Sequence, residues 1–540
     1  MILNAIKKIT GIEKDANDRG IAFALKYAAD ILLYIAVFFY LILTGAVLPL
    51  YLPGYEMLGT ERGQFWVRSL LLSGKVLLIP IAIYVLYFIV RSIKEKSIIK
   101  FTILPTDIPA VLFCISVTVS YALSDEKLIA LYGERGWYIG LISYLSVGFG
   151  VLVIPRLGKA KNPFFPVIMA TSFVVCMIGI VLDFAGNVFG FEGWSADKVS
   201  TIGNVNWFCG YLMTVMFTGV SAFFLIKKGK QSEKKGFTQI IIIYLLVAFY
   251  MMFTQGSASA YLALWAVLLA LLIISGKDVC SVHRVSGLIL LCAISNLVHA
   301  LYISAGGVIR ANDRIGWMLQ NPVVASVLLA VALILFFVTG NQLKKGKEIK
   351  VNIGIILTVI TLCAALVFLL LLIANTISKV GYLGKEGSLF WFDYTWGSSR
   401  GATLSIGMEV FKGMTPFEKI FGKGPDTFFS FLMSGRFPET AEKCVVYFGG
   451  ARLTNTHCEL LTMLVNTGIA GTVTFYGLLI SVMIKGFRKK TITALACSLG
   501  ILAYIINNIF SFQTAVNVSQ LALVAGFGAW AVVCDKSEDG

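Results

Sequence analysis

Long apolar runs recur along almost the whole chain, and short polar or basic segments separate them. Most runs approach the roughly 20 apolar residues that a helix needs to cross a bilayer, and shorter runs are tolerated in packed helices. The pattern therefore predicts an all-α integral membrane protein with about fourteen transmembrane helices. The expected cores are 29–51, 69–90, 106–123, 137–155, 163–182, 205–226, 238–254, 259–276, 286–303, 321–339, 351–375, 458–484, 492–510 and 517–534.

Residues 376–456 form the one long segment between apolar runs. Apolar residues recur there at helical spacing, as in Leu404, Met408 and Phe411. We expect one or two amphipathic helices lying on the outer membrane face, with a disordered spacer as the alternative. The expected organisation is a cytoplasmic segment 1–28, helices 1 to 11 in 29–375, an extracytoplasmic loop 376–456, helices 12 to 14 in 457–534 and a cytoplasmic tail 535–540.

The composition supports a membrane location, with 58% apolar residues, 14% charged residues and a mean hydropathy of +0.84. Soluble domains carry about 25% charged residues. The net charge of +16 would also suit nucleic acid, but the basic residues are scattered over inter-helix loops, so no nucleic-acid partner is expected. Short cytoplasmic loops of membrane proteins carry an excess of Lys and Arg. If the N-terminus is cytoplasmic, most basic clusters of this chain fall in cytoplasmic loops, so we expect both termini to be cytoplasmic. No cleavable signal pattern precedes the first apolar run.

The chain has three histidines and ten cysteines. His457 stands where the long loop re-enters the membrane. His283 falls in a cytoplasmic loop, and His299 falls within an expected span. No metal site is expected, because the outer carboxylates are scattered and no CxxC spacing occurs. Cys444 and Cys458 are the two cysteines expected outside, which leaves open a disulfide or two free thiols.

Four segments occur in order along the chain: Leu131–Gly136 with Gly140, Gly203–Leu212, Ser398–Gly401 with Ile420–Phe428, and His457 with Gly468 and Gly471 in the spacing H-x10-G-x2-G. Together they resemble the O-antigen ligase and O-antigen polymerase superfamily of bacterial membrane proteins. They extend over about two thirds of the chain, and their order is more specific than any one motif. Cys458 departs from the family's usual Asn, and the expected span number exceeds that of a typical ligase, which favours a polymerase or another subgroup.

The resemblance implies a glycosyltransferase of GT-C-like architecture in the bacterial cytoplasmic membrane. Such an enzyme is metal-independent and inverting and uses no cofactor. Its donor is a saccharide on a polyprenyl diphosphate such as undecaprenyl diphosphate, and its acceptor is a hydroxyl of a glycan or lipid core at the outer face. Other membrane proteins of polysaccharide biosynthesis in the cell envelope are further expected partners. Ligase and polymerase activities both remain open.

The expected reaction requires a base for the acceptor hydroxyl and cations for the diphosphate at one site. His457 is expected to take the acceptor proton, because imidazole is neutral and basic at working pH; the alternative is an interfacial anchor. Arg400 and Arg135 are expected to bind the diphosphate, since guanidinium groups match phosphate oxygens. Secondary arginines, each with surface anchoring as the alternative, are Arg62, Arg310, Arg314 and Arg452.

Other polar positions have two interpretations each. Asn204 and Asn206 either cap a helix or contact substrate. Gly422 and Gly424 either shape a turn or present amides to phosphate. Lys75, inside the second apolar run, either snorkels to the interface or has a functional role.

A second function class fits the same apolar pattern. Lipid-linked oligosaccharide flippases and other transporters also have many spans, but their charged residues line a central cavity within the membrane. Here the polar motifs collect outside the spans, which favours the transferase. A non-catalytic assembly protein is the third alternative.

Overall fold

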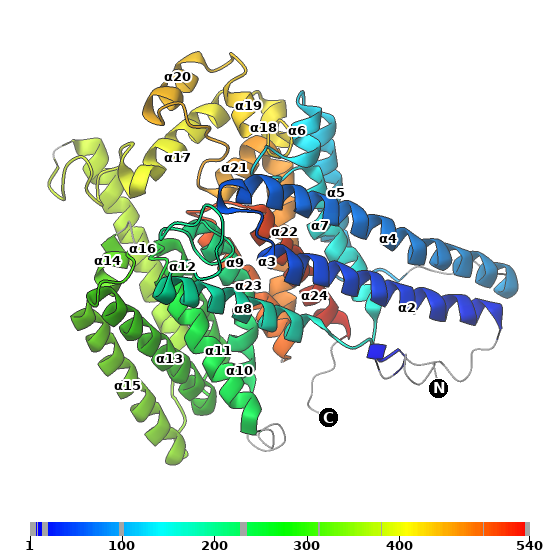
Figure 1. Cartoon of the computed structure of the whole chain (residues 1–540), viewed down its shortest axis with the longest axis horizontal. Helices are drawn as coiled ribbons and strands as arrows, with labels where there is room; N and C mark the ends of the chain where they lie inside the picture. The colour runs from blue at the N-terminus through cyan, green and yellow to red at the C-terminus, as the bar shows by residue number, and fades with distance from the viewer. Residues whose placement is uncertain are drawn as a thin grey trace.

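The computed structural model describes residues 7, 9–12, 20–96, 102–226, 235–310, 314–379, 381–489 and 491–534. All regular structure within these residues is helical (Figure 1). A bilayer core offers no water to the backbone, so apolar segments of this kind satisfy their amides and carbonyls within helices. The protein is therefore an all-α protein with the helices of a multi-pass membrane protein.

Eleven helical segments in the described part are long and apolar enough to cross a membrane. Several begin at an asparagine or aspartate whose side chain accepts from the first backbone amides, as Asn321 does for α15 and Asp278 for α13. The eleven are α2 (Ile21–Leu41) continued by η1 (Ile42–Val47) and α3 (Leu48–Leu50), η2 (Tyr55–Met57) with α4 (Leu58–Glu95), α8 (Phe164–Ala185), α9 (Val205–Val215) with α10 (Phe217–Leu225), α11 (Lys235–Phe253), α12 (Ala258–Ser275), α13 (Val279–Ser304), α15 (Pro322–Lys344), α16 (Ile353–Ser378), α22 (Gly468–Phe487) and α24 (Ala515–Cys534).

Three shorter apolar helices occupy the remaining predicted segments: α5 (Asp107–Ala122), α7 (Leu141–Val153) with the 3-10 turn η3 (Ile154–Leu157), and α23 (Ile492–Asn507). Thirteen of the predicted cores each coincide with one helical segment, whereas the core predicted at 458–484 is divided at Thr467 into α21 (Glu459–Asn466) and α22. Eleven of the helical segments reach the length of a span. The count of fourteen spans stays a prediction. The tight turn expected between the seventh and eighth runs is present, because α11 ends at Phe253 and α12 begins at Ala258.

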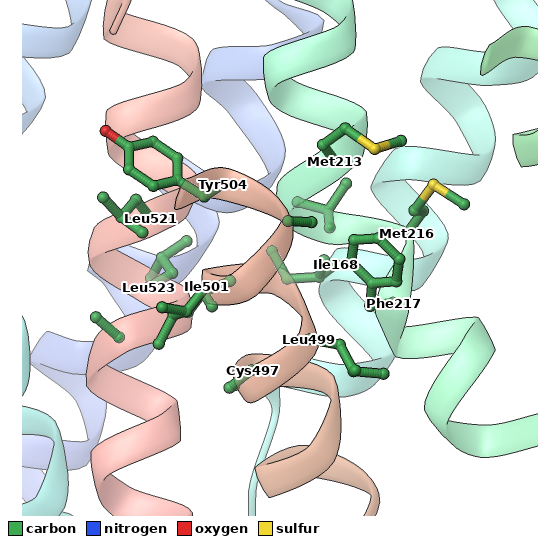
Figure 2. Packing of buried hydrophobic residues seen from close by; sticks show 14 of the residues in the cluster. Ile168, Met213, Met216, Phe217, Cys497, Leu499, Ile501, Tyr504, Leu521 and Leu523 are labelled. Atoms are coloured by element: carbon green, nitrogen blue, oxygen red, sulfur yellow. The ribbon is translucent and has the colours of Figure 1, made fainter. Parts of the chain in front are cut away.

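The centre of the bundle is built around α23 and α24. Figure 2 shows α23, with Leu499 and Ile501, between α24 on one side and the α9–α10 pair on the other. Close helix contacts depend on glycine here. A Cβ on Gly526 of α24 would lie 2.8 Å from the carbonyl oxygen of Gly150 in α7. Small residues at such crossings let membrane helices approach closely.

The predicted loop 376–456 is folded. Its helices gather at one end of the molecule with α21 (Figure 1), around a core of its own that includes Ile406, Phe428 and Cys444. The described residues thus form four helices instead of one or two, and the disordered-spacer alternative is wrong for them. Cys444 and Cys458 are both free thiols, so no disulfide joins them. The four helices of the loop are α17 (Trp396–Lys412), α18 (Pro416–Phe421), α19 (Phe428–Leu432) and α20 (Pro438–Tyr447). The short helices elsewhere are α21 (Glu459–Asn466), which follows the loop, α6 (Lys127–Tyr132) and α14 (Arg314–Leu319).

Candidate functional site

His457 lies in a turn immediately before α21. Its φ of 52° is in the left-handed region, which is uncommon outside glycine. The turn is fixed from both sides: Asn455 Oδ1 accepts from the His457 amide at 3.0 Å, and the Thr456 hydroxyl donates to the Cys458 carbonyl at 2.9 Å. The direction of the imidazole is therefore set by its neighbours in sequence.

The His457 ring is mostly buried. Its Nδ1 is buried and makes no hydrogen bond within the described part of the chain. The edge of the ring meets Phe512, with centroids 4.9 Å apart. Burial lowers the pKa of His457 to about 4, and the positive charge of Arg400 contributes. The imidazole is therefore neutral near pH 7, with a nitrogen lone pair available as a base.

Arg400 follows a break in α17. Gly397, Ser398 and Ser399 have φ values of 60°, 59° and 70°, so three successive left-handed residues precede it. Its Nε donates to the carbonyl of Phe510 at 3.1 Å and its Nη1 to that of Gly397 at 2.9 Å. The break aims the guanidinium at the segment between α23 and α24.

Residues 508–514, which join α23 to α24, complete the site. The Glu459 amide donates to the Asn508 carbonyl at 3.0 Å, and Glu459 Oε2 accepts from the Gln513 amide at 2.9 Å. The Gln513 side chain donates to the hydroxyl of Tyr504. We call His457, Arg400, Glu459 and residues 508–514 the His457 site. Sequence reasoning missed this segment, although the polar residues Asn508, Ser511, Gln513 and Thr514 interrupt the apolar pattern between the two helices.

A chain of aromatic contacts links distant motifs to this site. Trp207, at the start of α9, meets Trp137 edge-on at 5.5 Å between centroids. Trp137 meets Phe512 at 5.0 Å, and Phe512 meets His457 at 4.9 Å. Segments more than 300 residues apart in sequence therefore converge on one place.

Asp426 links the segment Ile420–Phe428 to the loop around Arg135 by hydrogen bonds. Its Oδ2 accepts from the backbone amides of Glu134 at 2.7 Å and Ile139 at 3.1 Å. Burial raises the pKa of Asp426 to about 7, and the nearby Glu134 carboxylate adds to the rise. Glu134 in turn pairs with Arg452 at 3.0 Å. The loop around Arg135 is thereby held against the Gly422–Phe428 turn.

Unusual backbone conformations collect in the same segments. Eight residues other than glycine have positive φ in the described part. Four of them, Ser398, Ser399, Asp426 and His457, belong to the segments that the sequence singled out, and Tyr138 lies between Gly136 and Gly140 of another. Strained conformations of this kind persist where the surrounding structure enforces them, and they cluster at functional sites. This observation is independent of any motif spacing and points to the same place.

The asparagines and glycines have protein partners. Asn204 caps α9 by accepting from the amides of Asn206 at 2.8 Å and Trp207 at 3.4 Å, whereas Asn206 is half-buried. The amides of Gly422 and Gly424 donate to the carbonyls of Glu418 and Asn466. These amides are used within the protein, so the turn-shaping interpretation accounts for both glycines without a ligand.

The predicted arginines are in different environments. Arg62 is buried and donates to the carbonyls of Tyr51 and Thr201, so protein oxygens hold its guanidinium. Arg135 is exposed and has no hydrogen bond or ion pair to any described residue. Arg452 is largely exposed beside its Glu134 partner.

The two remaining arginines are Arg310, in the loop after α13, and Arg314, the first residue of α14. Arg310 is buried and pairs with Asp183 of α8 at 2.6 Å. The side chain of Arg314 lies outside the described residues. Arg310 is not part of the His457 site. Among the arginines whose side chains are described, Arg400 and, by its exposure, Arg135 remain the cations best suited to an incoming anion.

Within the described residues, no group of three or more His, Cys, Asp or Glu side chains is placed to hold a metal ion. Function must be inferred from the site itself, because no family model matches the sequence and no curated protein is similar to it.

Proposed function

We propose that the protein is a membrane glycosyltransferase of the O-antigen ligase or polymerase type. It would transfer a saccharide from a polyprenyl diphosphate to a hydroxyl of a glycan or lipid-core acceptor at the outer face of the bacterial cytoplasmic membrane. The observation that carries the proposal is a neutral imidazole beside a guanidinium, His457 with Arg400, where strained segments from across the chain meet.

In the proposed reaction His457 accepts the proton of the acceptor hydroxyl. The hydroxyl oxygen attacks the anomeric carbon from the face opposite the diphosphate. The bond from that carbon to the diphosphate oxygen breaks with its electron pair, so polyprenyl diphosphate leaves and the configuration inverts. General-base catalysis of this kind contributes about 10²–10⁴-fold in rate.

The arginines would bind the two phosphates of the donor. The backbone carbonyls of Phe510 and Gly397 accept hydrogen bonds from Arg400, and carbonyls are weaker partners for a guanidinium than phosphate oxygens. A diphosphate beside Arg400 would also offset the positive charge that lowers the pKa of His457. Donor binding would thus make His457 a stronger base when it is needed.

The exposure of Arg135 suits a second phosphate contact, provided that the loop around Trp137 keeps it near the site. Arg452 is a further exposed cation on the same assembly through Glu134. Arg62 is better explained as a structural residue, because its burial leaves no side for a ligand.

The test is transfer of a labelled polyprenyl-diphosphate glycan to an acceptor by the purified protein in liposomes, with and without a chelator. Wild type should form product, and His457→Ala should lose turnover while it still binds donor. His283→Ala is the matched control, because His283 hydrogen-bonds Thr339 and is no part of the His457 site. Movement of the labelled lipid across the bilayer without product, unchanged in His457→Ala, would overturn the proposal in favour of a flippase.

A further inference from the structure

A long groove separates the α2–α4 pair from the helices beside it. In Figure 1, α2 and α4 lie side by side and reach away from the other helices. The groove is lined by α2, α4, α5 and α7 with the turn after η3, and its volume is about 2210 Å³. It shares no lining residue with the His457 site.

The size and the walls of the groove indicate a long apolar ligand. Pockets for small molecules measure roughly 300–1,000 Å³, so this groove is more than twice as large. Its walls are mainly aliphatic and aromatic side chains, such as Leu78 and Phe88 of α4, Leu112 of α5 and Phe149 of α7. An extended hydrocarbon chain would cover these side chains, whereas a polar metabolite would leave them exposed.

The ionisable side chains in the groove have an excess of positive charge. Two acidic residues, Asp30 and Asp107, are already engaged by the protein. Asp107 forms two bonds of 2.7 Å with Arg156, and Asp30 accepts from the Tyr84 hydroxyl. The basic residues that line the groove are Lys26, Lys75, Arg156 and Lys159.

Arg156 is paired with Asp107, whereas Lys26, Lys75 and Lys159 form no ion pair with a described carboxylate. Lys75 also belongs to α4, one of the helices long and apolar enough to cross a membrane. A charge in such a helix is costly unless it meets a counter-charge or reaches the interface. Basic pockets between membrane helices are suited to anionic lipid headgroups.

We propose that this groove binds an anionic phospholipid from the surrounding bilayer. Its acyl chains lie along the apolar walls of α4, α5 and α7, and Lys75 and Lys159 attract its phosphate. The lipid fills the space between the α2–α4 pair and the remaining helices. This site is separate from the His457 site, because the two have no residue in common.

The test is native mass spectrometry of the purified full chain after exchange into equal amounts of phosphatidylglycerol and phosphatidylcholine. Wild type should retain phosphatidylglycerol in preference. Lys75→Gln and Lys159→Gln should each reduce that preference about fivefold, as expected for one lysine near an anionic lipid. Lys94→Gln is the matched control, because Lys94 is an exposed lysine of α4 outside the groove.

A second kind of variant keeps the lysines of the groove and reduces its volume. Gly74 lines the groove and has no atom within 4 Å of a built Cβ, so Gly74→Phe should project into the groove and lower lipid retention. Gly477→Phe, on the exposed side of α22, should not. Equal retention of both lipids by wild type, or unchanged retention in both lysine variants and Gly74→Phe, would overturn the site. Displacement by an equal amount of polyprenyl phosphate would overturn the assignment to a bilayer phospholipid.

Discussion

Arg400 donates from its Nε to the backbone carbonyl of Phe510 at 3.1 Å, and this bond joins the long loop to the connection between α23 and α24. Two residues further on, Phe512 packs its ring against His457. One short connection therefore positions both the proposed cation and the proposed base. A substitution in the connection between α23 and α24 should alter the positions of both Arg400 and His457, although neither residue belongs to that connection.

Replacing Arg400 by lysine should separate charge from geometry. Lysine keeps the positive charge but lacks the planar fork that binds two phosphate oxygens and that here also reaches the Phe510 carbonyl. We expect Arg400→Lys to lower kcat/KM by about 10-fold or more, since a charge-assisted hydrogen bond contributes about 1.5–3 kcal/mol. Steady-state transfer kinetics with the polyprenyl-diphosphate donor give the measurement.

Lys412→Ala, at the far end of α17, is the matched control for a lost charge on the same helix. It should leave kcat/KM unchanged. Equal transfer rates for wild type and Arg400→Lys would argue against a phosphate-binding role for the guanidinium.

The activity should persist in mildly acidic solution. The pKa of His457 is lowered from 6.5 to about 4, so the protein without bound substrate keeps a neutral imidazole from pH 7 down to about pH 5. We expect kcat/KM to fall as the pH drops through about 4, because the base is then protonated. The measurement is a pH profile of transfer by wild type. A fall centred near pH 6.5 would show that His457 titrates as a solvated histidine and not as a buried base.

Asp426 should give the protein a pH-dependent stability. Its pKa is raised from 3.8 to about 7, so between these values the folded state binds more protons than the unfolded state. The contribution of Asp426 to stability should accordingly be highest below about pH 4 and should decline as the pH rises through 7. Asp426→Asn should remove this part of the dependence, because the amide oxygen can still accept from Glu134 and Ile139 without titrating.

Thermal unfolding of wild type and Asp426→Asn in detergent between pH 4 and pH 8 measures the effect. Asp426→Ala is the contrasting variant, because it leaves two buried amides unsatisfied and should cost about 1–3 kcal/mol per group at every pH. Parallel pH curves for wild type and Asp426→Asn would mean that Asp426 is ionised throughout that range.

Much of the fold follows from one-dimensional patterns. Apolar runs located every helix now assigned to the membrane, because burial in lipid requires both the composition and the helix. The four helices of the long loop were under-predicted, since each is short and is stabilised by a shared core around Phe428 and Ile406 that no local window contains. Helices of that length depend on tertiary packing.

The candidate site was predictable in part for the same reason. His457 and Arg400 stand in segments with recognisable spacing, and the structure brings them together. Glu459 and Gln513 escaped notice, because their hydrogen bond joins residues 54 apart and depends on how α23 returns to the site. Arg62 belongs to none of the motifs and was expected in an outside loop. It is instead buried against the carbonyls of Tyr51 and Thr201.

The buried pair of Arg310 and Asp183 offers a test of how the helices near α13 are held. Both side chains are 2% exposed and are joined at 2.6 Å. Arg310→Met should destabilise the protein by about 3–5 kcal/mol, because it leaves the Asp183 carboxylate buried without a counter-charge. The double variant Asp183→Leu with Arg310→Met should recover most of that loss, since it removes both charges and keeps the volume apolar. Chemical unfolding in detergent of wild type, both single variants and the double variant gives the coupling free energy. Simple additivity of the two single effects would mean that the pair is hydrated and contributes little, and Arg310 would then be available as a cation for other partners.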